Sequence, residues 1–323
     1  MPTTAASSSL IFIGFIAGRA KLVRPEAVRD LSNLVFLVLT QAMLFRTMSS
    51  VHLERLELRP VFQYFAVGAA LFFAMLLAYG RDSRASVLAL ASIFSNTLMI
   101  GVPLIGLAYG QEGLVLLFTL ISLHALVLLT LATLVLELQM AHEQAAETGE
   151  HRHMLRTVWQ AVRSAIVHPV PLPIIAGLLF AQTGLVLPEV VGKPLQLLGQ
   201  ALGPIALLLV GVTLAFTKVG HQFGAALRIA LVKCVVHPLV LAALGWSLGL
   251  SGMPLAVMIV AAALPVGANV FLFTQRYEVA QEEVTASIAV STALALVTVP
   301  AVTALEVARS ARAMFSGLMS CTV

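Results

Sequence analysis

Charged side chains are scarce in this sequence. Aspartate, glutamate, lysine and arginine make up only 11% of its 323 residues, whereas 59% are hydrophobic and the mean hydropathy is +0.98. A soluble domain carries about 25% charged residues, so this chain cannot present a polar surface to water. The composition therefore indicates that a lipid bilayer is its solvent. The formal net charge of +4 gives no indication of a nucleic acid partner.

Cysteine and enzyme motifs are also scarce. The two cysteines, Cys234 and Cys321, lie in an apolar segment and in the tail, so neither a disulfide framework nor a metal site is implied. The stretch "HEQAA" at 142–146 lacks the second histidine of a zinc protease helix, and the sequence has no G-x-S-x-G motif and no P-loop. These absences argue against an enzyme, an ATP-driven pump and any cofactor.

Long apolar segments dominate what remains. A bilayer core needs about 20 apolar residues per helix. Ten apolar segments approach this length, so the sequence predicts an all-α membrane protein with ten transmembrane helices. The first segment has no basic region before it, so it does not read as a cleaved signal peptide. The ten segments are 5–18, 31–49, 60–79, 86–109, 113–136, 167–184, 195–216, 224–249, 254–275 and 284–307.

The distribution of basic residues predicts the topology. If the N-terminus is outside, most lysines and arginines fall in inner loops, among them Arg81, Arg84 and Arg228. Because positive residues favour the cytoplasmic side, both termini are expected outside. The expected location is the cell membrane, which is the inner membrane in a Gram-negative cell.

The two halves of the chain repeat one another. Residues 22–28 read "LVRPEAV" and residues 185–191 read "LVLPEVV"; Pro103 lies 81 residues after Leu22, and Pro265 lies 80 after Leu185. Five segments per half make the second half inverted, a plan common in secondary transporters. We therefore expect one repeat at 1–138, a cytoplasmic linker at 139–164 and a second repeat at 165–323.

The fourth and ninth segments are weakened at their centres. Proline removes a backbone donor and glycine adds freedom, so each segment should break into two half-helices. The breaks are expected within "MIGVP" at 99–103, with Pro103 in the first turn of the second half, and within "AALPVGANVF" at 262–271. Two helix N-termini would then meet at mid-membrane, where they suit a carboxylate. The alternative is that both prolines only kink packed membrane helices and form no binding site. The expected substrate-binding residues here are Asn96, Thr97, Gly101, Pro103, Pro265, Gly267 and Asn269.

These segments carry a family resemblance. The stretches "SNTLMIGVPLIGLAYG", "ALPVGANVFLFTQRYEV" with "STALALVTVP", and "GRAKLVRPEAVRDLSNLVFLVLTQAMLF" together resemble the auxin efflux carrier family. The resemblance implies a scaffold domain of segments one, two, six and seven, a transport domain of the rest, elevator-like alternating access and organic anion substrates. It also implies that Asn96, Pro103 and Pro265 lie near the crossover. One departure is that Thr40 and Gln41 stand where the family usually has a proline; Gln41 either faces the substrate or bonds a neighbouring helix.

Lysine is rare inside the apolar segments, so Lys233 is a further candidate. It lies in "LVKCVVHP" of the eighth segment, where a central charge is unfavourable by about 2.5–3.5 kcal/mol on insertion scales. Lys233 either attracts an anion in the cytoplasmic vestibule or snorkels to the inner surface. His124, in the fifth segment, either contributes to the site or bonds a backbone carbonyl.

Together these patterns predict a secondary transporter (permease), and the family resemblance implies that it moves small organic anions by elevator-type alternating access. No aspartate or glutamate lies deep in a segment, so a proton relay lacks its usual carboxylate, and efflux driven by the membrane potential is favoured. A sodium-coupled symporter remains open, as does a non-transporting receptor or scaffold. The expected partners are a carboxylate substrate and the bilayer, while a sodium ion and a homodimer are left open.

Overall fold

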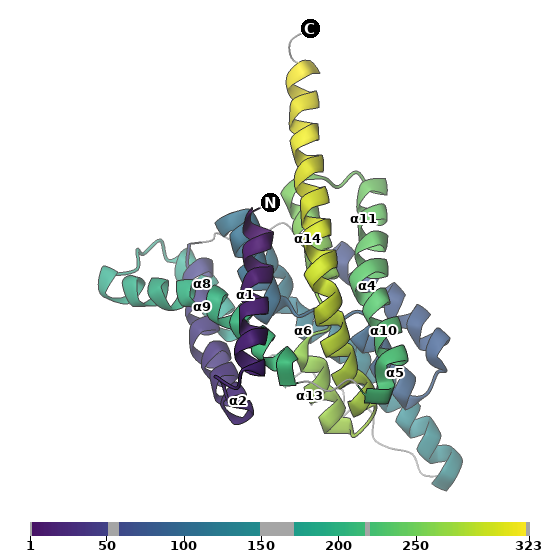
Figure 1. The fold of residues 1–323 in the computed structure, drawn as a ribbon. Helices are drawn as coiled ribbons and strands as arrows, with labels where there is room; N and C mark the ends of the chain where they lie inside the picture. Colours follow the sequence, from purple (N-terminus) through teal and green to yellow (C-terminus); the bar gives the residue numbers. More distant parts are fainter. Residues whose placement is uncertain (1, 51–57, 149–170, 217–219, 321–323) are drawn as a thin grey trace.

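The chain folds almost entirely into helices (Figure 1). The computed structural model describes residues 2–50, 58–148, 171–216 and 220–320. The α-helices are α1 (Pro2–Arg19), α2 (Pro25–Leu34), α3 (Thr40–Met48), α4 (Arg59–Tyr79), α5 (Ser83–Ala91), α6 (Val102–Thr148), α8 (Pro171–Gln182), α9 (Glu189–Phe216), α10 (Phe223–Leu231), α11 (His237–Ser247), α12 (Gly252–Ala263), α13 (Ala268–Tyr277) and α14 (Gln281–Ser320). Three π-helical segments, η1 (Val35–Leu39), η3 (Thr97–Gly101) and η5 (Val232–Val236), and one 3₁₀ turn, η4 (Gly220–Gln222), join them.

Six stretches of helix in the described residues are long and apolar enough to cross a membrane. Shorter apolar helices accompany them at Ser9–Arg19, Leu172–Gln182 and Gly252–Ala263. The prediction of an all-helical protein with membrane-spanning segments is therefore confirmed, while the count of ten spans and their inverted repeat stay predictions. The six are Glu26–Met48, Arg59–Tyr79, Thr97–Met140, Glu189–Phe216, Gly220–Ser247 and Gln281–Glu306.

The longest helix is two helices joined at a glycine. Gly110 has φ 63° and ψ −152°, which kinks the chain inside α6. A Cβ added there would meet nothing within 4 Å, so the glycine is needed for its positive φ and not for space. The stretch Thr97–Met140 therefore contains the end of the predicted fourth segment and the whole of the fifth. Residues 149–170, in which most of the predicted linker falls, lie outside the described residues.

The helices form two groups. The first group is α1, α2, α3, α8 and α9, which pack on one another; the second is α4, α5 and α10 to α14. Helix α6 contacts both groups, and Figure 1 shows the first group on the left and the second on the right. Between α1 and α9 the backbones approach so closely that a Cβ on Gly14 would collide with the Leu208 carbonyl, and one on Gly211 with the Ile11 carbonyl. Small residues allow such contact between membrane helices.

The ends of the chain mark one end of the molecule. The start of α1 and the end of α14 point to the same end, which we call the terminal end (Figure 1). Helices α2, α5 and α13 lie toward the opposite end, here the far end.

Candidate functional site

The first break lies earlier in the chain than the sequence predicted. Helix α5 ends at Ala91, and the second half-helix begins at Thr97 with the π-helical segment η3, so the unwound residues are 92–96. Pro103 is in the first turn of the α-helical part but a full π turn inside the half-helix. The prediction that the break falls within "MIGVP", residues 99–103, is therefore wrong. The wider π turn precedes the proline, whose ring would clash with the carbonyl four residues back in a regular helix.

The second break interrupts the predicted ninth segment. Helix α12 ends at Ala263, Leu264 and Gly267 have extended ψ angles of 150° and 142°, and α13 begins at Ala268. Pro265 therefore lies in the extended stretch itself, where its fixed φ and missing donor disturb no helix. Gly267 is the residue that directly precedes the new helix.

The two breaks cross and bond to each other. The Asn96 N–H donates to the Pro265 carbonyl at 2.9 Å, and the Gly267 N–H donates to the Phe94 carbonyl at 2.9 Å. These bonds form an antiparallel bridge between Ser95 and Val266. Unwound backbone at membrane depth persists only where its polar groups are satisfied, and here each break satisfies the other.

Buried side chains satisfy further backbone groups at the crossing. The Ser291 hydroxyl accepts from the Val266 N–H at 3.0 Å, and the Ser95 hydroxyl donates to the Ala261 carbonyl at 2.7 Å. The Lys233 Nζ atom donates to the Ala262 carbonyl. The crossing is therefore a fixed structural unit with contributions from α12, α14 and η5.

Two helix N-termini point into the crossing. The Asn96 side-chain oxygen caps one of them by accepting from the Met99 N–H at 3.3 Å. The NH₂ group of the same side chain takes no part in this cap. The α13 N-terminus has no side-chain cap on its first turn. An uncapped helix start presents N–H groups and a partial positive charge to an anion.

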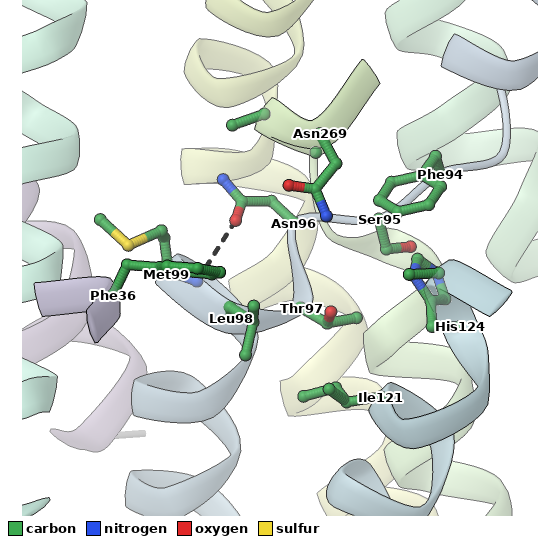
Figure 2. A pocket seen from close by; sticks show the side chains of 13 residues that line it. Phe36, Phe94, Ser95, Asn96, Thr97, Leu98, Met99, Ile121, His124 and Asn269 are labelled. Atoms are coloured by element: carbon green, nitrogen blue, oxygen red, sulfur yellow. Dashed lines mark hydrogen bonds between the residues drawn. The ribbon is translucent and has the colours of Figure 1, made fainter. Parts of the chain in front are cut away.

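Two cavities adjoin these N-termini. The crossover cavity, about 90 Å³, is bounded by both breaks and by α6. Figure 2 shows the Asn96 and Asn269 side chains close together, with the Asn96 amide toward Met99, and Ser95 and His124 on the opposite side. The vestibule, about 490 Å³, shares Phe36, Asn96, Met99, Ala268 and Asn269 with it and is otherwise lined by Ser32, Asn33, Leu37, Val210, Thr213, Leu214, Ile288, Ala289 and Thr292.

The structure brings together only part of the predicted set. Asn96, Thr97, Gly267 and Asn269 line the crossover cavity. Gly101, Pro103 and Pro265 line neither cavity. A Cβ on Gly101 would come within 2.8 Å of the Leu264 side chain. These three residues shape and pack the breaks and do not face the cavities.

Lys233 is placed differently from both interpretations of the sequence. Its side chain is 0% exposed and lines neither cavity. It therefore does not snorkel to a surface, so that prediction is wrong. It does not line the vestibule either, and its attraction for the anion stays a prediction. The reason is tertiary: η5 packs against α12 and α14, so the amine reaches the backbone of α12 behind the crossing.

Several lining residues escaped the sequence argument. Ser95 lines the crossover cavity, and Asn33, Thr213 and Thr292 line the vestibule. His124, which the sequence offered as a candidate, also lines the crossover cavity. Hydroxyl and amide side chains inside apolar segments are the sequence signal for such lining residues. The signal is weak because Ser and Thr side chains often bond a carbonyl of their own helix. Thr292 does so here, with its hydroxyl on the Ile288 carbonyl at 2.7 Å.

Gln41 also bonds its own helix. Its amide donates to the Phe36 carbonyl at 2.8 Å, and Thr40 donates to the Val35 carbonyl at 2.8 Å. Both bonds span five residues across the π-helical segment η1, which replaces regular helix there. Gln41 lines neither cavity, so neither of its two predicted roles is confirmed.

Crossed, broken helices that meet beside a cavity inside an apolar helical protein define the class: a membrane protein built like a secondary transporter. The family model described as "Membrane transport protein" matches residues 8–303. The chain therefore belongs to this family of auxin efflux carrier-like transporters.

Characterised and uncharacterised relatives match nearly the full chain. It is 28% identical over 299 residues to a putative malonate transporter of Rhizobium meliloti, covering 90% of each chain. It is 24% identical to auxin efflux carrier component 8 of Arabidopsis thaliana, covering 88% of this chain and 91% of the relative. It is 25% identical to the uncharacterized transporter YfdV of Escherichia coli, covering 90% and 92%. The protein is accordingly a membrane transporter of a small molecule and not an enzyme.

Proposed function

We propose that this protein is a secondary transporter of small organic anions that works by elevator-type alternating access and mediates efflux. The observation that carries the proposal is the uncapped start of α13 beside the Asn96 and Asn269 amides in one cavity. Helix N-termini and amide N–H groups bind carboxylates without a formal cationic side chain.

The cavity linings support a small anion as substrate. Neither lining contains an aspartate, glutamate, lysine or arginine, so nothing there repels a carboxylate, and the two N-termini supply the attraction. The vestibule volume of about 490 Å³ falls within the usual range for small-molecule sites, roughly 300–1,000 Å³. The relative described as a putative malonate transporter agrees with this class of substrate.

The position of the vestibule supports an elevator. On one side it is lined by α2, η1 and α9 of the first helix group, and on the other by the crossing, α13 and α14. A site between two bodies changes its accessibility when one body moves against the other. The first group would be the scaffold, and the ten spans would form two inverted repeats, as the motifs at 22–28 and 185–191 predict.

The direction follows from charge and topology. The vestibule lies beside the last turns of α9 and the first turns of α14, on the side of the far end, which the basic residues assign to the cytoplasm. An anion leaving a cell that is negative inside gains about 2.3 kcal/mol per charge per 100 mV. Efflux therefore needs no coupling ion for an anion of this kind.

Flux in proteoliposomes tests the proposal. We expect labelled malonate to cross membranes that contain the protein, with Asn269→Ala reducing the rate at least several-fold and Gln182→Ala, on the exposed end of α8, leaving it unchanged. Replacing sodium by choline should not alter the rate; a requirement for sodium would favour a symporter. Absence of flux for malonate and a panel of other carboxylates, with correctly folded protein, would favour a receptor or scaffold.

A further inference from the structure

Four ionisable side chains meet behind the crossing. Tyr64 of α4, Lys233 of η5 and His237 of α11 are 0% exposed, and His124 of α6 is 2% exposed. The Tyr64 ring centre lies 5.8 Å from that of His124 and 5.3 Å from that of His237. Lys233 and His237 are four residues apart, which places them on the same face of the helical stretch η5–α11. The proposed anion site uses only His124 of these, as a lining residue.

Hydrogen bonds connect this cluster to the crossover cavity. The Tyr64 hydroxyl bonds Ser95 Oγ at 2.7 Å and His124 Nε2 at 3.3 Å, and both partners line the cavity. On the inner side, neither ring nitrogen of His237 has a hydrogen-bond partner among the described residues. Hydrogen bonds therefore extend from the cavity wall to Tyr64, whose ring packs against the ring of His237, one helical turn from Lys233.

Lys233 and the cavity wall bond to adjacent residues of α12. Its Nζ atom donates to the Ala262 carbonyl, and the adjacent Ala261 carbonyl accepts from Ser95, which lines the cavity. Two neighbouring carbonyls of α12 thus accept hydrogen bonds from Lys233 on one side and from Ser95 in the cavity wall on the other. A charge on Lys233 and a charge in the cavity interact across a layer of fully buried residues, where screening by water and salt is weak.

No counter-charge accompanies Lys233 in the part of the chain described. Its own segment contributes Cys234, α11 contributes His237, α6 contributes His124 and α4 contributes Tyr64. Helix α12 has no titratable side chain, α10 contributes only the exposed Arg228, and α14 contributes the Ser291 hydroxyl. The buried Glu306 of α14 interacts with Arg309 instead, and the ion pair found in the described residues, Arg84–Glu283, lies elsewhere. A buried ammonium without a counter-charge is strongly unfavourable, and a nearby anion stabilises it.

We propose that Lys233 binds a proton cooperatively with the anion, so that the transporter carries an anion and a proton across the membrane together. The inference rests on the proposed function and adds a coupling site to it. On loading, the neutral amine takes a proton from water on that side and becomes an ammonium. On unloading, the anion leaves, and the same N–H bond breaks to release the proton to water on the other side.

This coupling changes the charge that is moved. A monoanion with one proton crosses without net charge, and a dianion crosses as one negative charge. Since each charge contributes about 2.3 kcal/mol per 100 mV, proton coupling reduces the influence of the membrane potential and adds that of a pH gradient. It supplies a proton site without the carboxylate relay that the sequence lacks.

Calorimetry counts the protons directly. Malonate is titrated into purified wild-type protein near neutral pH in buffers of different ionisation enthalpy, and we expect uptake of about one proton per malonate bound. Lys233→Gln should reduce this number to near zero. Lys193→Gln, at an exposed lysine of α9, is the matched control and should behave as the wild type. Binding by the wild type without proton uptake would overturn the inference, and this outcome does not depend on the variant folding.

A second ligand separates protonation of the protein from protonation of the ligand. Methanedisulfonate keeps both acid groups ionised, so proton uptake on its binding must occur on the protein. We expect the wild type to take up a proton with this ligand as well and Lys233→Gln not to do so. Uptake with malonate alone, or undiminished uptake in Lys233→Gln, would contradict a role for the lysine.

Flux measurements distinguish this inference from the proposed function. With the membrane potential clamped at zero by valinomycin and equal potassium, a pH gradient should drive malonate uphill in the wild type and not in Lys233→Gln. Malonate flux that ignores the pH gradient would leave the anion transporter intact and refute the coupling. Proton-linked binding without any flux would support the proton site and refute transport.

Discussion

Ser95 and Val266 face each other across an antiparallel bridge, although 171 positions of the numbering separate them. The bridge is made by the backbone of their neighbours: Asn96 donates to Pro265, and Gly267 donates to Phe94. It holds two helix N-termini beside one cavity and ties α5 and α6 to α12 and α13. The crossing should therefore move as one body, and changes within it should affect stability and transport together.

Gly267 is expected to tolerate no side chain. A Cβ there would lie 2.8 Å from Phe94 Cδ1 and 2.9 Å from the Ser95 carbonyl oxygen, so the bridge must open to admit it. Gly267→Ala should destabilise the protein by about 1–3 kcal/mol and abolish flux, measured by thermal unfolding in detergent and by malonate transport. Gly224→Ala, where a Cβ meets nothing within 4 Å, is the control and should be neutral or slightly stabilising. A fully stable and active Gly267→Ala protein would show that the bridge is dispensable.

Asn96 combines two roles that two substitutions can separate. Its Oδ1 caps the Met99 N–H, and its amide NH₂ adjoins the cavity. Asn96→Asp keeps the cap oxygen but places a negative charge next to an anion, so it should fold normally and lose binding. Asn96→Ala loses the cap, worth about 1 kcal/mol, as well as binding. Malonate affinity by calorimetry and the unfolding temperature report the two effects; an Asp variant that binds malonate normally would exclude Asn96 from the site.

The contact between α1 and α9 depends on glycine at two places. A Cβ on Gly211 would collide with backbone atoms of Ile11 and Phe15, and one on Gly14 with the backbone of Leu208. Backbone atoms cannot move aside as side chains do, so Gly211→Ala should force the two helices apart and lower the unfolding temperature. Gly224→Ala again serves as the control. Equal unfolding temperatures in both variants would mean that this contact adds nothing to stability.

The topology can be tested with reporters that are active on one side of the membrane. A reporter inserted after residue 155 should be cytoplasmic and one fused after residue 323 should be outside, because most basic residues lie in the loops on the side of the linker. The start of α1 and the end of α14 already share one end of the molecule (Figure 1). Both reporters on the same side of the membrane would contradict the predicted arrangement of five and five spans.

The sequence by itself determined that lipid is the solvent and that helices fill the chain. Low charge and long apolar segments require backbone groups to be satisfied internally, and helices do so locally. Proline, glycine and asparagine also indicated which two segments are interrupted. These are local properties, so the sequence alone predicts Asn96 and Asn269, which line the crossover cavity.

Only the tertiary structure decided where each break falls and what lies behind it. The first break is at 92–96, ahead of Gly101 and Pro103, because Asn96 and Gly267 find their backbone partners in the opposite break and a π turn accommodates the proline. Lys233 lies behind the crossing because η5 packs on α12. It is gathered there with Tyr64, His124 and His237 only because four separate elements, α4, α6, η5 and α11, pack together. Contacts between residues this far apart in the chain leave no periodicity in the sequence, and their positions follow from how the helices pack.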